Sequence, residues 1–556
     1  MDNQRRTMGA VTVVIAAVAA QLPSAMQALG GDDIYVLANL RSASWSRRLF
    51  AFNVDTTAAG YMPWWAGAPL QRRFIRLPAS ALLWLESELF GFRSFPYHLV
   101  TIALLAGSCL LLFTLLSKRA PVVTAAAASI LPALHPAASE IVADLCCQPI
   151  ATAGLFSVAS AAAWSRMRER PSAGALGLVV LLCSLAVTSY EAAVALPVFL
   201  LLADLWLGAP DGSKARRGWP RLAMLGVVAA YVPWAIAIRH GLVAPDTKAV
   251  RPLGEVLLAL RFDSVAYVCK ALGLFDPTAP TTYWLQHRVG EPLIAAITVG
   301  LLAAVVWLVR GSRLGITGVV GFALFLAPPL LTRATVSGLN FPTLRQLYLP
   351  VLMGAPPLMV ALARARLRLR VAIPVVAWAA ALAVESQIAG GTLDMNRDRR
   401  LVTESTERIL AGVPGDRTVV AVGTYLCGFA PSLIWAGPSL LGIPSRSDDP
   451  DPQLTTVDER TLIARSDDGF DVRTEADVPT REPGANRGPD WIPSQPAELA
   501  ERGSQRIAGA TVTIEAREGQ RITALRYRFD RPLSEMVFVR FRGCAEPVRM
   551  ALEPAR

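Results

Sequence analysis

The sequence predicts an α-helical polytopic membrane protein of about eleven spanning helices, followed by a small C-terminal domain that contains β-strands. Two observations carry this prediction. Hydrophobic residues make up 53% of the 556 residues and charged residues only 17%, a balance too apolar for a soluble chain of this length. The apolar residues also gather in runs of about 15 to 20, which is the length that a helix needs to cross a bilayer.

Each predicted span is one of these apolar runs. We place the spans at Gly9–Leu29, Tyr97–Leu116, Pro121–Leu134, Pro149–Trp164, Ala173–Thr188, Ala192–Trp206, Leu222–Ala237, Pro292–Val309, Leu314–Leu331, Tyr348–Ala363 and Val371–Ala389. The first run follows Arg5 and Arg6 and could instead be a cleaved signal peptide. It is long, however, and it lacks a small-x-small cleavage pattern before Asp32, so we interpret it as a span.

Basic residues fall in clusters, one in every second connection between the spans. The clusters are Arg5/Arg6, Lys118/Arg119, Arg166/Arg168/Arg170, Lys214/Arg216/Arg217/Arg221, Arg310/Arg313 and Arg364/Arg366/Arg368/Arg370. Because positive loops are retained in the cytoplasm, this pattern predicts a multi-pass protein of a cell (inner) membrane with a cytoplasmic N-terminus and a periplasmic C-terminal domain. The net charge of +11 is therefore explained by topology and does not indicate a nucleic-acid partner.

The predicted domains are a membrane part, residues 1–389, and an extracytoplasmic part, residues 390–556. The first outer loop, residues 30–96, mixes tryptophans with arginines, which suits short amphipathic helices lying in the membrane interface. In the next long outer connection, Val256–Leu260 and Val265–Phe275 are apolar runs interrupted by charges. We expect an interfacial or broken helix there.

After Gly390 the helical periodicity gives way to Pro, Gly and Asp, and we expect a flexible stretch from Ser445 to Pro496. Alternating runs predict strands, the second and third joined as a hairpin, at Thr418–Val422, Thr511–Ala516, Ile522–Phe529 and Met536–Phe541. Cys427 and Cys544 both fall in this outer domain. An oxidising compartment would permit a disulfide between them, and two free thiols are an equal alternative.

Charged groups at the outer ends of spans are the candidate functional residues, because an ionisable group beside hydrocarbon is costly unless it faces protein or water. Asp32 and Asp33 follow the first span directly. Either carboxylate could accept a proton from a hydroxyl acceptor. Alternatively, the two acids simply end a helix in water.

Three further positions share this placement. Glu140 and Asp144 are four residues apart, so a helix would put both on one face, where they could bind a divalent cation or position a substrate. Glu191 lies in a short connection between two apolar runs. Arg345 stands at the outward mouth of a span and could hold a phosphate by charge-assisted hydrogen bonds. Solvated loop positions and, for Arg345, snorkelling to the interface are the alternatives.

Four segments match a known superfamily in order: Phe74–Leu116, Ala133–Phe156, Leu185–Trp206 and Leu344–Pro350. Over about two thirds of the chain they resemble polytopic glycosyltransferases of the GT-C superfamily, which use polyprenyl-phosphate sugars. The second segment contains the His-Pro-x-x-x-Glu pattern of the O-mannosyltransferase-like branch. No tetratricopeptide repeats, which members of that branch carry, follow the membrane part here.

The resemblance implies an acceptor-activating carboxylate on the first outer loop, here Asp33 or Asp32. The donor- and phosphate-binding residues that it implies are Arg345, Glu140, Glu191, Arg76 and His135. A divalent cation near Glu140 and Asp144 is compatible with it but not required.

The chain also departs from the family pattern at two places. Where the family often has Gly-Arg-x-Asp after the glutamate, this sequence has Cys147, Gln148, Pro149 and Ile150. Tyr190 stands where a lysine commonly precedes the equivalent of Glu191. Charged donor contacts are therefore missing at both places.

The function that these observations predict is transfer of a sugar from a polyprenyl-phosphate carrier to a glycan, lipid or protein acceptor on the extracytoplasmic side. The expected chemistry is inverting displacement of a hexosyl group within the membrane lipid environment. The missing charged residues favour one alternative, a non-catalytic membrane component of an envelope polysaccharide assembly system. Another alternative, a transporter of lipid-linked saccharides, should show an internal repeat of the spans, and we find none.

Overall fold

The structure is a computed structural model of the chain. It describes residues 2–27, 45–55, 71–72, 74–91, 93–207, 309–335, 344–364, 418–423, 441–443, 452–470, 503–507, 509–519, 521–541 and 548–550, together with single positions between them such as Asp33, Met224 and Tyr267. The chain forms two compact units. The first unit comprises Met1–Gln27, Ala43–Phe52 and Arg73–Thr392, and the second comprises Ala28–Ser42, Asn53–Arg72 and Leu393–Arg556.

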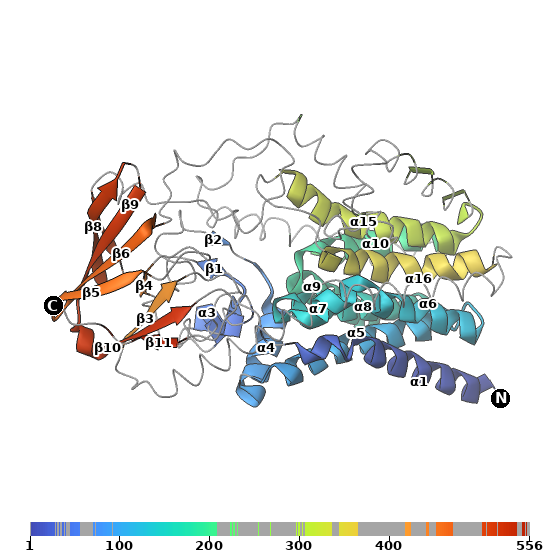
Figure 1. Ribbon diagram of the computed structural model, residues 1–556. Helices are drawn as coiled ribbons and strands as arrows, with labels where there is room; N and C mark the ends of the chain where they lie inside the picture. Colours follow the sequence, from blue (N-terminus) through green and yellow to red (C-terminus); the bar gives the residue numbers. More distant parts are fainter. Residues whose placement is uncertain are drawn as a thin grey trace. The chain divides into compact units, whose positions relative to one another are not determined.

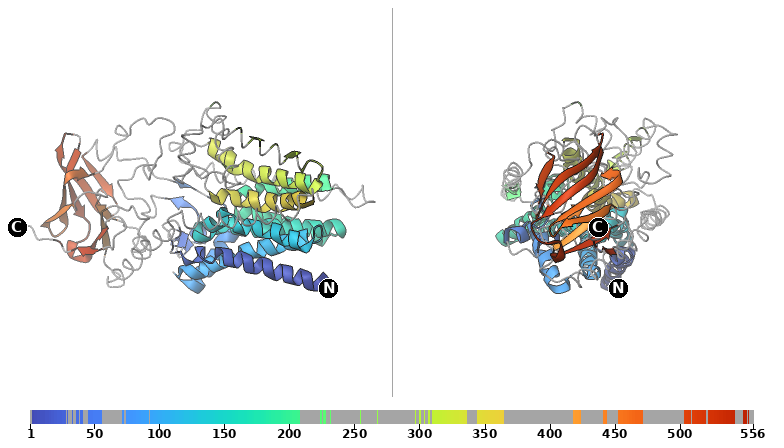
Figure 2. Two further views of the ribbon diagram at one scale, coloured as in Figure 1. Left: turned by 45° about the vertical axis from the view of Figure 1, so that its right-hand side comes forward. Right: turned by 60° about the vertical axis from the view of Figure 1, so that its left-hand side comes forward.

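The first unit is a bundle of helices, several of which run side by side along one direction (Figures 1 and 2). Its α-helices are α1 (Asp2–Gln21), α3 (Trp45–Leu49), α4 (Leu77–Phe90), α5 (Ser94–Leu116), α6 (Val122–Leu134), α7 (Pro136–Ala143), α8 (Gln148–Glu169), α9 (Ala173–Ser189), α10 (Ala195–Leu207), α15 (Arg313–Thr335) and α16 (Tyr348–Arg364). Short 3-10 turns connect some of them: η1 (Ser24–Met26), η2 (Leu145–Cys147), η3 (Glu191–Val194) and η4 (Leu344–Leu347).

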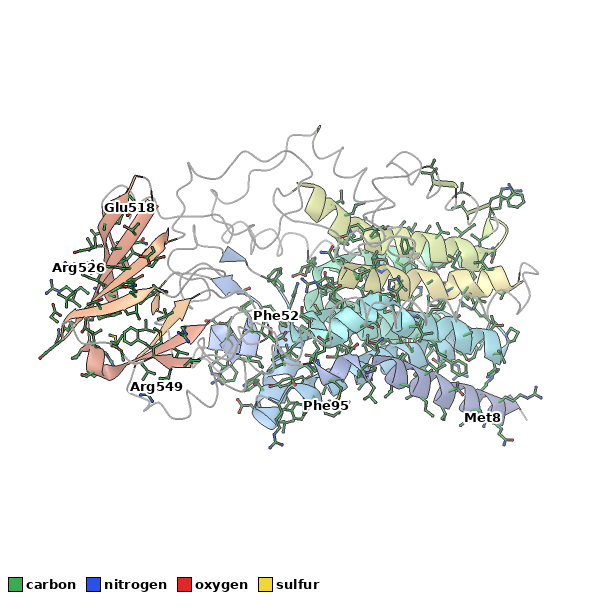
Figure 3. All side chains as sticks on the ribbon, viewed as in Figure 1. Met8, Phe52, Phe95, Glu518, Arg526 and Arg549 are labelled. Carbon is green, nitrogen blue, oxygen red and sulfur yellow. The ribbon has the colours of Figure 1, made fainter. Side chains whose placement is uncertain are left out.

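Several of these helices are long and apolar enough to cross a membrane. Among the described residues, four qualify, namely Ser94–Leu116, Leu145–Glu169, Arg313–Leu331 and Leu344–Ala363. The pair α6 and α7, bent by 50°, makes a fifth if it is one span. On the bundle surface, Met8 and Phe95 turn outward (Figure 3) and are 64% and 41% exposed. Such outward apolar side chains suit a lipid-facing surface.

The bend between α6 and α7 has a local cause. His135 precedes Pro136 and adopts an extended conformation, with φ −70° and ψ 138°. A proline ring disfavours the helical conformation of the residue before it. The first helix therefore ends at Leu134, and the second begins at the proline itself, where a missing N–H costs nothing.

Most predicted spans coincide with described helices. The first differs in its end, because α1 stops at Gln21 rather than at the predicted Leu29, and Pro23 follows two residues later. Three predicted spans lie mostly outside the described residues, so the total of eleven stays a prediction. They are Leu222–Ala237, Pro292–Val309 and Val371–Ala389. The two interrupted runs, Val256–Leu260 and Val265–Phe275, lie largely outside them too.

Glycines let the last two helices touch backbone to backbone. A Cβ built on Gly318 of α15 would lie 2.7 Å from the carbonyl oxygen of Gly354 on α16, and one on Gly354 would lie 2.6 Å from Cβ of Phe322. On the other side of α16, a Cβ on Gly154 of α8 would lie 2.9 Å from the ring of Tyr348. Small residues permit such close approach where water cannot drive association. These contacts fix α16, and therefore η4 at its start.

The second unit contains two main sheets and one strand pair. The four-stranded sheet has the order β11-β10-β3-β4, and the five-stranded sheet has the order β5-β6-β9-β8-β7. Their strands are β3 (Thr418–Gly423), β4 (Leu441–Ile443), β5 (Gln453–Asp458), β6 (Thr461–Phe470), β7 (Ser504–Ile507), β8 (Ala510–Glu518), β9 (Arg521–Phe529), β10 (Met536–Phe541) and β11 (Val548–Met550). In the first loop, β1 (Val54–Asp55) pairs with β2 (Gln71–Arg72).

The two sheets of the second unit share one apolar core. Val420 and Phe538 from the four-stranded sheet pack in one cluster with Leu462, Tyr527 and Phe529 from the five-stranded sheet. In the four-stranded sheet β3 lies parallel to both neighbours, whereas the pairs of the five-stranded sheet are antiparallel. The unit is therefore a β-sandwich.

The predicted strands are confirmed, including the hairpin of β8 and β9, in which Glu518 pairs with Arg521. Its turn contains Gly519 at φ 63°, a conformation that favours glycine. The predicted flexible stretch Ser445–Pro496 is wrong in part, because β5 and β6 lie within it. Leu462 and Ala464 of β6 alternate into the core, but the surrounding Pro and Asp residues obscure this short pattern. Cys427 and Cys544 lie outside the described residues.

Candidate functional site

Arg345 is the centre of one charged cluster. Its backbone N–H donates to Oε2 of Glu140 at 2.8 Å, and its Nη1 donates to Oδ2 of Asp144 at 2.9 Å. The same Nη1 lies 3.2 Å from Sγ of Cys147, and Nε lies 3.7 Å from Oε1 of Glu140. Residues some 200 positions apart in the sequence thus meet around one guanidinium. We call these four residues the Arg345 centre.

The structure brings Glu140 and Asp144 together in a way that the sequence did not predict. The two residues do not share one helix face, because α7 ends at Ala143 and Asp144 adopts φ −124° and ψ 110°. Asp144 instead begins η2, where its Oδ1 accepts from the N–H of Cys146 at 3.1 Å. Both carboxylates nevertheless reach Arg345.

Arg76 is the centre of a second cluster. Its Nη2 lies 3.4 Å from Oε2 of Glu191, the first residue of η3. Its guanidinium carbon lies over three aromatic rings, 4.3 Å from that of Phe74, 5.2 Å from that of Tyr190 and 5.3 Å from that of Phe52. Both Arg76 Nε and Glu191 Oε1 are buried and have no hydrogen-bond partner among the residues that the structure describes. We call these five residues the Arg76 centre.

Tyr190 connects the two centres electrostatically. Burial raises the pKa of its phenol to about 12, while the positive charges of Arg76 and Arg345 act in the opposite direction. Tyr190 therefore stays a neutral hydrogen-bond donor at pH 7. The positive charge next to this phenol belongs to Arg76, whose guanidinium carbon lies 5.2 Å from the ring centroid.

His135 has a structural role at the start of α7. Its Nδ1 accepts from the N–H of Ala137 at 3.1 Å, so the imidazole caps the helix that carries Glu140. A cap fixes where a helix begins. His135 is thus placed to position Glu140, and its predicted contact with a donor stays a prediction.

The two predicted base residues are only partly described. Asp33 is buried, with 1% of its surface exposed, and has helical backbone. It belongs to the second compact unit. Asp32 lies outside the described residues. The role of either as a base stays a prediction.

Sequence reasoning missed one buried polar pair. Nε2 of Gln148, the first residue of α8, donates to both carboxylate oxygens of Glu86 on α4, at 2.9 and 3.0 Å. Glu86 is 2% exposed and Gln148 is fully buried. A signal for it existed, because Glu86 interrupts an otherwise apolar helix face and Gln148 is one of the departures from the family pattern. Cys147 was likewise noted only as a departure.

Comparisons with known proteins find similar solved structures but no matching family. No protein-family model matches the chain, and no curated protein matches it. Among solved structures, it is similar to ArnT from Cupriavidus metallidurans bound to undecaprenyl phosphate, with 15% identity and a TM-score of 0.43. ArnT in the apo state gives 13% identity and a TM-score of 0.46. Each match covers 78% of this chain and 85% of the other. Likeness at this level does not assign a family or an activity.

Proposed function

We propose that the chain is a membrane glycosyltransferase that takes a sugar from a polyprenyl-phosphate carrier. The observation that carries this proposal is the pair of arginine centres, each held by acids and each linked to Tyr190, within a bundle of apolar helices. Charged groups in such a bundle are costly to keep and usually serve a substrate. A lipid-linked sugar phosphate has an apolar tail, which suits the apolar helices, and an anionic head, which suits an arginine.

Arg76 is better suited than Arg345 to bind the phosphate. Two carboxylates already surround Arg345, so that cluster carries no surplus positive charge. Within the described ranges, Arg76 has one carboxylate, at 3.4 Å, and an Nε without a partner. A guanidinium with N–H groups to spare can make charge-assisted hydrogen bonds to a phosphate. In this proposal Arg345 instead holds Glu140 and Asp144 in place.

The proposed reaction is a single displacement. The acceptor hydroxyl oxygen attacks the anomeric carbon, the bond from that carbon to the phosphate oxygen breaks, and polyprenyl phosphate leaves with the electron pair. Arg76 stabilises the charge that develops on the leaving phosphate. The acceptor proton passes to a carboxylate, for which the sequence resemblance suggests Asp33 or Asp32. Glu140 and Glu191 are suited to accept hydrogen bonds from sugar hydroxyls.

The reaction as proposed assigns no step to a divalent cation. Glu140 and Asp144 would have to share their oxygens between such an ion and Arg345. The orientation that we propose, with a cytoplasmic N-terminus and the β-sandwich outside a cell membrane, is supported by the alternating basic clusters of the sequence. No described residue identifies the acceptor as a glycan, a lipid or a protein.

Transfer of labelled sugar from a panel of polyprenyl-phosphate donors, in membranes that contain the protein, tests this function. We expect transfer with the wild type, a donor KM raised about tenfold or more in Arg76→Gln, and loss of transfer in the Asp32→Asn, Asp33→Asn double variant. The matched control is Arg168→Ala, which breaks the Arg168–Asp204 ion pair (2.9 Å) at the other end of α8. That control should keep transfer. No transfer from any donor, with Arg76→Gln still complementing a deletion, would instead indicate a non-catalytic assembly component.

A further inference from the structure

The pair Glu86–Gln148 joins the helices that lead from the two arginine centres. Arg76 is the residue directly before α4, and Glu86 lies on that helix. Cys147, which contacts Arg345, is the residue directly before α8, and Gln148 is the first residue of that helix. A contact between Glu86 and Gln148 therefore fixes the start of α8 against the helix that begins after Arg76.

The hydrogen bonding of this pair is incomplete if Glu86 is ionised. Gln148 Nε2 donates to both carboxylate oxygens, while Oε1 of Gln148 is buried and has no partner in the described part of the chain. An unsatisfied buried acceptor costs free energy. A proton on Glu86 removes the deficit once the amide turns in the plane of the carboxyl group, because the acid O–H then donates to Gln148 Oε1 while Nε2 donates to the other carboxyl oxygen. The carboxylic acid and the amide then each donate one hydrogen bond to the other.

The surroundings of Glu86 favour the protonated form. Burial raises its pKa to about 8, opposed only by the Gln148 hydrogen bond. α4 packs against α3, α5, α8 and α9, and among the described residues no charged side chain of these helices affects that pKa. On α4 itself, Glu88 is exposed and accepts from the indole of Trp84. A pKa of about 8 corresponds to roughly ten protonated copies for each ionised one at pH 7.

We propose that Glu86 is a neutral carboxylic acid whose acid–amide pair with Gln148 positions the Arg345 centre relative to the Arg76 centre. Glu86 is thus a positioning residue, and its effect on transfer rests on the function proposed above. This pairing explains why a glutamine stands at position 148, where the sequence departs from the family pattern. A permanent cation at this position would ionise Glu86, whereas a glutamine pairs with the acid and leaves no charge buried between α4 and α8.

The first test is the melting temperature of the full-length protein in detergent, measured from pH 5 to pH 9. A folded-state pKa above the unfolded value contributes stability that is present at low pH and is lost as pH rises towards 8. The wild type should therefore lose several degrees over this range. Glu86→Gln, which keeps the shape and cannot ionise, should lose much less. Glu88→Gln, a matched change at an exposed acid on the same helix, should follow the wild type.

A second variant keeps the test decisive if Glu86→Gln does not fold. Gln148→Arg places a fixed positive charge against Glu86, so the loss of stability with rising pH should disappear. The proposal is overturned if the wild type shows no such loss, or if it persists unchanged in Glu86→Gln or in Gln148→Arg. These outcomes do not depend on any enzymatic activity.

Transfer activity provides the readout of positioning. We expect the wild-type rate to fall about tenfold from pH 7 to pH 9, as the protonated fraction falls, and the Glu86→Gln rate to change less than about twofold. Equal pH profiles for the two proteins would exclude a positioning role. Absence of transfer even in the wild type would contradict the proposed function, while the stability measurements would still decide the protonation of Glu86.

Discussion

The two arginine centres contain similar groups and differ in how far those groups are satisfied. Arg345 has two carboxylates, a thiol and a backbone hydrogen bond, and it ties α7 and η2 to η4. Arg76 has one long contact to a carboxylate and lies among three aromatic rings. An arginine whose N–H groups have partners within the protein stabilises the fold. An arginine with unpaired N–H groups can donate hydrogen bonds to an anionic ligand. The difference assigns a positioning role to the first and a binding role to the second.

Arg345→Ala should have the largest effect. It removes the positive charge of Arg345 from Glu140 and Asp144, and removing one partner of a partly buried ion pair is destabilising. Because the Arg345 side chain is 34% exposed, we expect a loss of about 1–3 kcal/mol in the free energy of unfolding, and a loss of transfer of about 100-fold or more. Thermal unfolding and the transfer assay measure the two effects.

Arg168→Ala is the control that separates these effects. It breaks an ion pair whose side chains are less exposed than that of Arg345, at 16% and 13%. The control should therefore lose similar stability but keep transfer. Equal loss of transfer in both variants would mean that activity simply follows stability, and the positioning role of Arg345 would be wrong.

Arg76→Gln should have a smaller effect on transfer than Arg345→Ala and a specific one on the donor. It breaks an ion pair whose side chains are 13% and 21% exposed and removes the contacts of the guanidinium with three aromatic rings, so we expect a loss of about 1–3 kcal/mol in the free energy of unfolding. The KM for the lipid donor should rise about tenfold or more, because a charge-assisted contact to phosphate is lost. Arg76→Lys should recover part of it. An unchanged donor KM in Arg76→Gln would remove the distinction between the two centres.

The close contact between Gly354 of α16 and Phe322 of α15 allows a test of helix packing by steric effects alone. Gly354→Ala must push α16 away from α15, since the new Cβ would lie 2.6 Å from that of Phe322. We expect a loss of about 1–3 kcal/mol. Gly177→Ala on α9 meets nothing within 4 Å and should be neutral or slightly stabilising. Similar melting temperatures for the two variants would show that the α15–α16 contact does not hold α16.

Arg526→Ala in the β-sandwich should have the smallest effect. Arg526 makes two 2.7 Å hydrogen bonds to Glu515, a more ideal geometry than either arginine of the bundle shows. It projects from the five-stranded sheet into solvent (Figure 3), where ion pairs contribute little. We expect an unchanged melting temperature and unchanged transfer. A clear loss of transfer would place a functional surface on this sheet.

The sequence predicted the helices and the later strands, because their periodicity is local. α5 is apolar throughout, and β8 and β9 alternate around Gly519. The site was predicted only as a set of candidates. Nothing local indicates that Glu140 and Asp144 would share Arg345, some 200 residues away, or that Glu86 would meet Gln148. Such pairings depend on how the helices pack, which one sequence does not reveal.

The same limit explains the errors. The composition around β5 and β6 is rich in Pro and Asp, so a window average hides the inward alternation of Leu462 and Ala464. The spacing of Glu140 and Asp144 suggested one helix face, but the helix ends between them. In both cases a tertiary contact, the sandwich core or Arg345, decides the local structure.

Binding of a labelled polyprenyl phosphate to the purified protein tests the central claim most directly. The comparison needs four proteins, namely the wild type, Arg76→Gln, Arg345→Ala and Arg168→Ala. We expect a Kd about tenfold higher or more for Arg76→Gln and an unchanged Kd for Arg168→Ala. Arg345→Ala should lie between them. Equal affinity in all four proteins, each shown to be folded, would contradict the assignment of Arg76 as the arginine that binds the lipid phosphate.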